Sequence, residues 1–279
     1  MTERHETYPN GIEALCLIAV LFFVELLIAG AIGDTGVFSH VARGDLDGLI
    51  TVAGNGVLFC ALLAYKRLNY SALFHPARNS VIATLSTLSL PVLMLVPGLV
   101  VGIGMINVLL LTLFPMTPSE EAMFEQMMSG GFVAALFSCI AAPVLEEMLF
   151  RGIILRSFLR QYSRRAAILG SAALFGFAHL NVYQLATGFV IGIIAGWLYE
   201  RSRSLWPCIV LHAAYNSAVT YLALTSTSQG DSSASLAGPI AAFACATAGA
   251  LLLKRLLGTE RMRQVADKRE SQPDRGGDT

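Results

Sequence analysis

Long, uninterrupted apolar runs are the feature that most constrains how this chain can fold. The first run extends from Ile12 to Ile32 and carries only two charged residues, Glu13 and Glu25. About 20 apolar residues suffice for a helix to cross a bilayer, and continuous rather than alternating runs indicate helices. Charged residues make up only 14% of the chain, against about 25% in soluble domains. We therefore predict an all-α, polytopic membrane bundle.

About eight transmembrane helices are predicted, at residues 12–32, 46–65, 81–114, 132–150, 166–180, 182–199, 205–224 and 236–253. The third run is too long for one straight helix, and Pro91 and Pro97 predict a kink in it. After the fourth span, arginines on one face predict an amphipathic helix at the membrane interface. The predicted divisions are an N-terminal tail, 1–11, a membrane domain, 12–253, with its catalytic core at 132–224, and a charged, disordered tail, 254–279.

The basic residues predict the orientation of these spans. With eight spans, all of the 19 Lys and Arg residues except Arg43 fall on one side of the membrane. Loops rich in Lys and Arg remain in the cytoplasm. We therefore expect an integral protein of the cytoplasmic (inner) membrane with both termini and the 254–279 tail in the cytoplasm.

Two adjacent glutamates and an arginine interrupt the fourth span in the stretch from Ala142 to Arg151. An ionisable group at membrane depth costs at least about 2.5 kcal/mol, so such residues are functional candidates. Glu147 and Arg151 stand four residues apart, which predicts an ion pair on one helix face. Glu146 is turned about 100° away and has only apolar neighbours one turn on. Its partner must come from another helix, and a desolvated glutamate is a usable general base.

Two histidines lie inside other predicted spans and could face Glu146. His179 ends the sequence Phe175-Gly-Phe-Ala-His179 late in the fifth span, and His212 opens His212-Ala-Ala-Tyr-Asn216 in the seventh. His212 and Asn216 share a helix face because they are four apart. Four polar side chains on three spans at compatible depths predict one functional cluster.

This set of side chains fits two kinds of hydrolytic chemistry. In the first, Glu146 takes a proton from water, a neutral histidine orients that water, and His212 with Asn216 stabilises an oxyanion. In the second, Glu146, His179 and His212 bind a divalent metal such as zinc, which activates the water. The sequence leaves both open, so the cofactor is undetermined.

The three motifs together resemble those of the CPBP family, which comprises CAAX proteases and bacteriocin-processing enzymes and is also called the Abi family. The resemblance covers about residues 132–224 and includes Phe-Arg-Gly after the glutamates and Leu205-Trp206 before the third motif. It extends to the intramembrane glutamic endopeptidases related to type II CAAX prenyl endopeptidases. The family was long described as metalloproteases, and its eukaryotic members cleave behind a prenylated cysteine.

The resemblance implies a role for each motif residue. Glu146 and His179 would activate water, and His212 and Asn216 would stabilise the oxyanion. Supporting roles would fall to Glu147, Arg151 and Phe175. The implied activity is hydrolysis of peptide bonds in membrane-associated proteins, including prenylated or bacteriocin-type substrates. The expected partners are membrane lipid and a membrane-anchored protein or peptide, with no nucleic acid.

Other functions remain as alternatives at this point. A proton-coupled transporter could relay protons through Glu25, Glu146 and the histidines, although no internal repeat is evident. A non-catalytic scaffold or bacteriocin-immunity protein could retain the same residues for binding. Leu46-Asp47-Gly48 is similar to a site-2 protease motif, but no His-Glu-x-x-His accompanies it. Glu25 either lines a pathway or forms a hydrogen bond that fixes helix packing.

Two local patterns predict further details of the bundle. Thr117 and Glu120, with proline between them, form a capping-box pattern that predicts a short helix. Gly188, Gly192 and Gly196 recur at four-residue intervals in the sixth span. Such a stripe of small residues predicts close approach of another helix.

Overall fold

The computed structural model describes residues 7–35, 41, 43–77, 79–128, 132–226 and 236–270, and within them the regular structure is helical, without strands. This confirms the predicted all-α bundle. The elements are α2 (Gly11–Thr35), α3 (Arg43–Lys66), α4 (Tyr70–Phe74), α5 (Val81–Leu93), α6 (Val96–Leu113), α7 (Pro118–Met128), α8 (Phe132–Leu136), the π-helix η1 (Phe137–Ala141), α9 (Ala142–Glu147), the π-helix η2 (Met148–Leu155), α10 (Arg156–Gln161), α11 (Arg164–Phe177), α12 (Val182–Ser202), α13 (Trp206–Ser226) and α14 (Ala237–Glu270).

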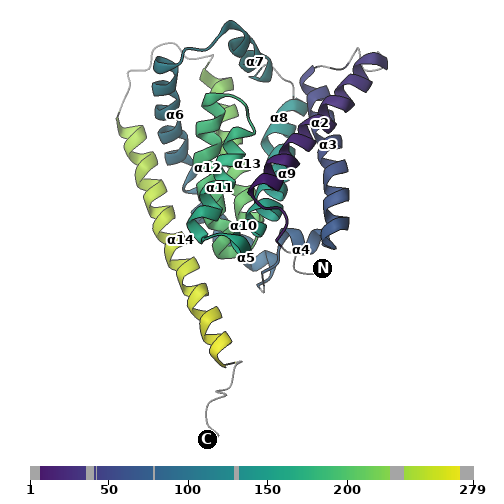
Figure 1. The fold of residues 1–279 in the computed structure, drawn as a ribbon. Helices are drawn as coiled ribbons and strands as arrows, with labels where there is room; N and C mark the ends of the chain where they lie inside the picture. The colour runs from purple at the N-terminus through teal and green to yellow at the C-terminus, as the bar shows by residue number, and fades with distance from the viewer. Residues whose placement is uncertain are drawn as a thin grey trace, which may run out of the picture.

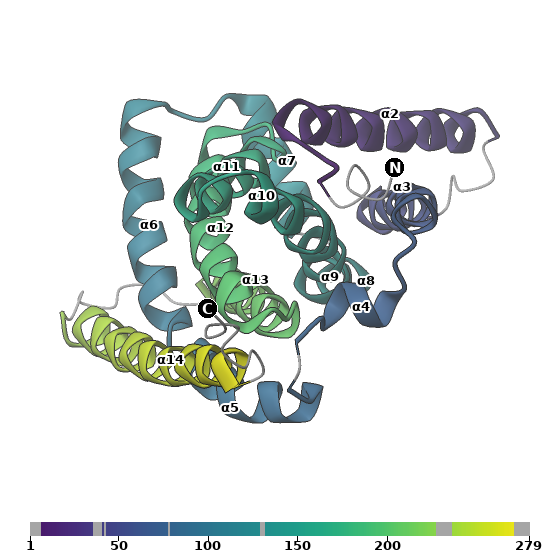
Figure 2. The same cartoon turned by 60° about the horizontal axis from the view of Figure 1, so that its bottom comes forward.

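The helices that carry the three motifs form the centre of the bundle. Figure 2 shows α9 to α13 grouped together, with α6 and α14 along one side and α2 and α3 along the other. Figure 1 shows that α2 begins and α14 ends at the same end of the molecule, which agrees with termini on one side of the membrane. Which side that is stays a prediction.

Seven helices in the described residues are long and apolar enough to cross a membrane. The prediction of eight such spans differs at residues 166–180, where α11 has only 14 residues. The reason is that α11 packs against protein, with Ala167, Ala172 and Phe175 buried, so neighbouring helices rather than bilayer thickness set its length. The third predicted span is divided into α5 and α6 close to its two prolines.

The fourth span differs from its prediction at its C-terminal end. It continues from Val133 to Gln161, so the predicted amphipathic stretch after Arg151 is part of the same helical run. The continuation through η2 is wholly buried, and Ile153, Ile154 and Leu155 have no exposed surface. The apolar side chains between the arginines pack inside the bundle, as the burial of apolar surface favours, and the predicted position of this stretch at the membrane interface stays a prediction.

The predicted close approach at the glycine stripe of α12 is confirmed. A Cβ atom at Gly192 would lie 2.9 Å from the Cα of Ala172 on α11, and one at Gly188 would lie 3.1 Å from the Cα of Gly176. The two helices are therefore in backbone contact, which fixes the α11–α12 turn and the residue in it, His179.

The predicted charged tail begins at residue 254, but α14 continues as a helix to Glu270. Residues 271–279 lie outside the described residues. The predicted domain boundaries stay a prediction.

Candidate active site

The glutamates lie between two π-helical segments of the fourth span. Glu146 and Glu147 end α9, with η1 before it and η2 after it. A π-helix places more residues in each turn than an α-helix, and such segments are frequent at functional sites. The Glu147 side chain is completely buried, whereas that of Glu146 is 33% exposed. The two carboxylates thus occupy different environments.

Glu147 forms the predicted ion pair with Arg151. The Nη1 atom of Arg151 donates a hydrogen bond of 2.8 Å to Oε1 of Glu147, and both side chains are buried. The guanidinium carbon of Arg151 also lies 4.6 Å from the centroid of the Phe175 ring, within the range of a cation–π contact. The charges therefore neutralise each other within the protein, as the sequence predicts.

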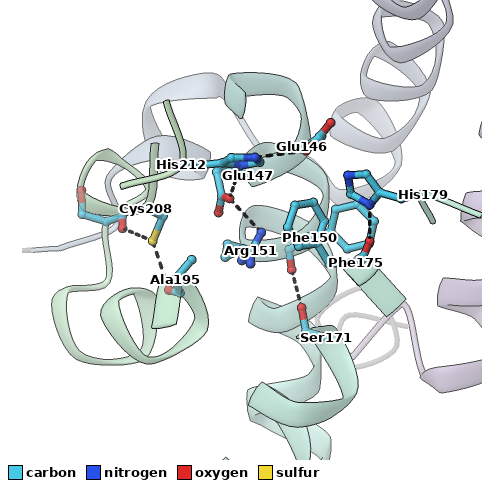
Figure 3. A network of polar contacts seen from close by, with 11 residues as sticks. Glu146, Glu147, Phe150, Arg151, Ser171, Phe175, His179, Ala195, Cys208 and His212 are labelled. Carbon is cyan, nitrogen blue, oxygen red and sulfur yellow. Dashed lines mark hydrogen bonds and ion pairs between the residues drawn. The ribbon is translucent and has the colours of Figure 1, made fainter. Parts of the chain in front are cut away.

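His212 connects the two glutamates across helices. Its Nδ1 atom lies 3.0 Å from Oε1 of Glu147, and its Nε2 atom lies 3.7 Å from Oε2 of Glu146 (Figure 3). Because an ionised carboxylate only accepts hydrogen bonds, Nδ1 is the donor to Glu147. The partner that Glu146 was expected to find on another helix is therefore His212 on α13.

His179 lies just beyond the end of α11, where its ring bonds the backbone of its own motif. Its Nδ1 atom lies 2.9 Å from the carbonyl oxygen of Phe175 (Figure 3). The backbone N–H of His179 instead bonds Gly176, so the carbonyl of Phe175 is free to accept from the ring. A carbonyl cannot donate, so Nδ1 carries a proton, and in the neutral ring Nε2 is then the acceptor.

Phe175 lies between the two histidines. Its ring centroid is 5.2 Å from that of His179 and 5.4 Å from that of His212, both with edge-on geometry. Its side chain is only 1% exposed. Phe175, the first residue of the second motif, therefore contacts both imidazoles and the Arg151 guanidinium with one aromatic ring.

Asn216 lies one helical turn after His212 on α13. Its Nδ2 atom donates a hydrogen bond of 2.9 Å to the backbone carbonyl of Ser138 in η1. The amide nitrogen has a second proton, which this bond does not use. The π-helix thus orients a carboxamide that retains one donor.

One cavity brings the candidate catalytic residues together. It has a volume of about 820 Å³, and its wall includes Glu146, His179, His212 and Asn216. Phe175 also lines it, whereas Glu147 and Arg151 are buried and do not line it. Four residues from three sequence-distant motifs therefore line one cavity.

The cavity wall also contains residues that the sequence analysis did not single out as functional. Ser138, Gln184, Thr187 and Tyr215 line it, as does Asp47 of α3. Tyr215 lies inside the third motif, so its position was a usable signal. Whether the other four residues face the cavity depends on the rotation of their helices, which the sequence does not specify.

Glu25 does not line this cavity. The Nδ2 atom of Asn55 lies 3.4 Å from its Oε1 atom. A Cβ atom at Gly54 would be 2.6 Å from the Cγ atom of Glu25. Of the two roles considered for Glu25, this geometry favours the packing contact between α2 and α3.

The donor set tests the metal alternative. Among the described residues, no three His, Cys, Asp or Glu side chains gather in a way that could hold a metal ion. The Glu146, His179 and His212 side chains as placed therefore do not form a metal-binding set.

Comparison with known proteins identifies the same region. A family model described as type II CAAX prenyl endopeptidase Rce1-like matches residues 127–218. The putative membrane peptidase YdiL of Bacillus subtilis (strain 168) is 30% identical over 89 residues, which are 32% of this chain and 36% of that protein. The chain thus aligns with about a third of this relative, and no solved structure matches. The matched segment carries all three motifs, so this region of the chain is similar to the type II CAAX prenyl endopeptidases and to a membrane peptidase.

Proposed function

We propose that this protein is an intramembrane endopeptidase that hydrolyses peptide bonds of membrane-associated proteins. The observation that carries the proposal is the cavity of about 820 Å³ whose wall includes Glu146, His179, His212 and Asn216. A space of this size can admit an extended peptide segment and a water molecule. The family match supports peptide-bond hydrolysis as the reaction.

In the proposed first step, Glu146 and His179 activate the water. The water donates one hydrogen bond to the Glu146 carboxylate and one to Nε2 of His179, which is an acceptor because Nδ1 donates to Phe175. Glu146 removes a proton as the water oxygen attacks the peptide carbonyl carbon. This attack forms a tetrahedral intermediate with a negatively charged oxygen.

His212 and Asn216 are the proposed donors to that oxyanion. Asn216 offers the Nδ2 proton that is not bonded to Ser138. Nε2 of His212 can donate when both ring nitrogens carry protons, because Nδ1 already donates to Glu147. When the C–N bond breaks, Glu146 returns its proton to the leaving nitrogen, so the products are a carboxylic acid and an amine, and the enzyme is regenerated. The acid then loses the second proton of the water to the amine, which gives a carboxylate and an ammonium group.

Glu147, Arg151 and Phe175 are proposed to position these groups. Glu147 holds Nδ1 of His212, and Arg151 balances the charge of Glu147. Phe175 supplies both the carbonyl that orients His179 and the ring between the two histidines. None of the three needs to contact the substrate.

The proposal is tested with Glu146→Gln and His179→Ala in purified protein supplied with membrane-anchored peptides. We expect cleavage, followed by mass spectrometry, to fall at least about 100-fold in both variants. The melting temperature should change little, because both side chains line a cavity. Glu25→Gln is the matched control, since it alters a membrane glutamate outside the cavity, and its cleavage rate should equal the wild-type rate. Unchanged cleavage in both variants would refute the mechanism.

A second measurement addresses the two forms of hydrolytic chemistry. The glutamate mechanism predicts that cleavage persists after exhaustive treatment with a chelator. Loss of cleavage on chelation, with recovery on adding zinc, would refute the glutamate mechanism in favour of a metal-dependent one. In that case Glu146, His179 and His212 would have to move closer together to bind the metal.

A further inference from the structure

One face of α3 forms part of the cavity wall. The residues of α3 that line the cavity are Gly44, Asp47, Gly48 and Thr51. Asp47, Gly48 and Thr51 follow Gly44 by three, four and seven residues, so all four residues lie on one side of the helix. Of these four side chains, only that of Asp47 carries a charge.

Close packing holds this face against the fourth span. A Cβ atom at Gly48 would lie 3.1 Å from the ring of Phe137, and one at Gly44 would lie 3.6 Å from the Cβ of Ala134. Phe137 precedes Ser138, whose carbonyl orients Asn216. The helix that carries Asp47 therefore contacts the same η1 segment that positions a proposed oxyanion donor.

Asp47 is free to interact with a ligand. It is exposed, and no hydrogen bond or ion pair joins it to any other described residue. Among the described residues of the cavity wall, Asp47 and Glu146 are the acidic ones, and none is a Lys or Arg. Carboxylates in a cleft with apolar walls attract cations and repel anions more strongly than they would in open water.

We propose that Asp47 is a specificity-determining residue that selects substrates with a Lys or Arg side chain near the scissile bond. Its carboxylate pairs with the cationic side chain, while an acidic side chain at the same position is repelled by it. This inference rests on the proposed peptidase function, because it assigns a substrate preference to the same cavity.

The alternative to substrate selection is that Asp47 only stabilises α3. An acidic residue near the start of a helix stabilises it through the helix dipole. Asp45 lies in the first turn of the same helix but does not line the cavity. Asp45→Asn is therefore the matched control for Asp47→Asn, because both remove one charge from the same helix end.

The experiment uses the full-length protein in lipid nanodiscs and two synthetic peptides. They share one apolar anchor of about 20 residues and differ only in a pair of lysines or a pair of glutamates beside it. We expect the wild type to cleave the lysine peptide with a higher kcat/KM. The Asp47→Asn variant should lower the lysine-to-glutamate ratio of kcat/KM about tenfold, while Asp47→Glu and Asp45→Asn should keep it. An unchanged ratio in Asp47→Asn, or an equal fall in Asp45→Asn, would overturn the inference.

A binding measurement separates failure of this inference from failure of the proposed function. In the Glu146→Gln background, fluorescence anisotropy of the labelled lysine peptide should report tighter binding than that of the glutamate peptide. Adding Asp47→Asn should reduce this difference about tenfold. A preference in binding without cleavage by the wild type would refute the peptidase and retain the charge selection. Equal binding of both peptides by the Glu146→Gln protein would refute the selection alone.

Discussion

The buried carboxylate of Glu147 accepts a hydrogen bond from Nδ1 of His212 at 3.0 Å, although 65 residues separate them in the chain. The same carboxylate oxygen accepts a bond from Arg151. This shared acceptor ties the fourth span to α13 and turns the other ring nitrogen of His212 toward Glu146. A buried structural ion pair thereby fixes the geometry of the cavity wall.

The first prediction concerns that ion pair. Arg151→Ala should destabilise the protein by about 3–5 kcal/mol, because it leaves the Glu147 charge buried without its counter-ion. Thermal unfolding in detergent and the yield of monodisperse protein measure the effect. Arg164→Ala is the control, since Arg164 forms a partly exposed pair with Glu200 that should contribute less than about 1 kcal/mol. A normal melting temperature for Arg151→Ala would contradict the positioning role.

Packing at Gly192 provides a second prediction. Gly192→Ala places a Cβ atom 2.9 Å from the backbone of Ala172, so α11 and α12 must separate. We expect a loss of about 1–3 kcal/mol and lower activity, because the turn joining these helices carries His179. Gly104→Ala on α6 is the control, since nothing lies within 4 Å of its Cβ position. It should be neutral or stabilise the helix by up to about 1 kcal/mol, and equal melting temperatures for the two variants would count against backbone contact.

Asn216 should affect turnover more than substrate binding. Replacing it by Ala removes the carboxamide held by Ser138, and loss of one oxyanion donor lowers kcat about 100- to 1000-fold. KM should stay nearly constant, because the donor acts on charge that develops in the transition state. Ser217→Ala, in the next residue of α13, is the control, because its exposed hydroxyl bonds only Ala213. A rise in KM at constant kcat would instead assign Asn216 to ground-state binding.

The start of α7 should respond to acid. The predicted capping box is confirmed, because the backbone N–H of Thr117 donates to the carboxylate of Glu120 at 2.8 Å and the backbone N–H of Glu120 bonds Thr117 Oγ1 at 3.3 Å. The donors of Thr117 lower the pKa of Glu120 below its usual 4.5. A lowered pKa in the folded state means that the cap stabilises α7 above pH 4.5 and that this contribution disappears as the pH falls through the folded pKa.

Hydrogen exchange of α7 peptides, corrected at each pH for the exchange rate of the free peptide, tests this expectation. Protection should fall on acidification in the wild type and should already be low and independent of pH in Glu120→Ala. Because Ser119 and Ala122 line the cavity, loosening of α7 should also open the cavity wall. Protection that is the same in both proteins at every pH would contradict the cap.

The sequence by itself determined the features that depend on composition or on local spacing. Apolar runs specified an all-α membrane bundle, because lipid leaves no other way to satisfy backbone hydrogen bonds within a continuous apolar segment. The four-residue separation of Glu147 and Arg151 specified their ion pair, and the regular glycines of α12 specified a close helix contact. The three motifs identified the candidate site residues, because ionisable groups are rare at membrane depth.

Only the tertiary structure decided how these groups face one another. Helix rotation and depth depend on packing between distant segments, which local spacing does not encode. That packing shortened α11, continued the fourth span through two π-helical segments, and placed His212 between Glu146 and Glu147. It also turned the ring of His179 onto its own backbone and brought Asp47 of α3 into the cavity wall. The sequence therefore supplied the chemical groups, and long-range packing supplied the single cavity in which they meet.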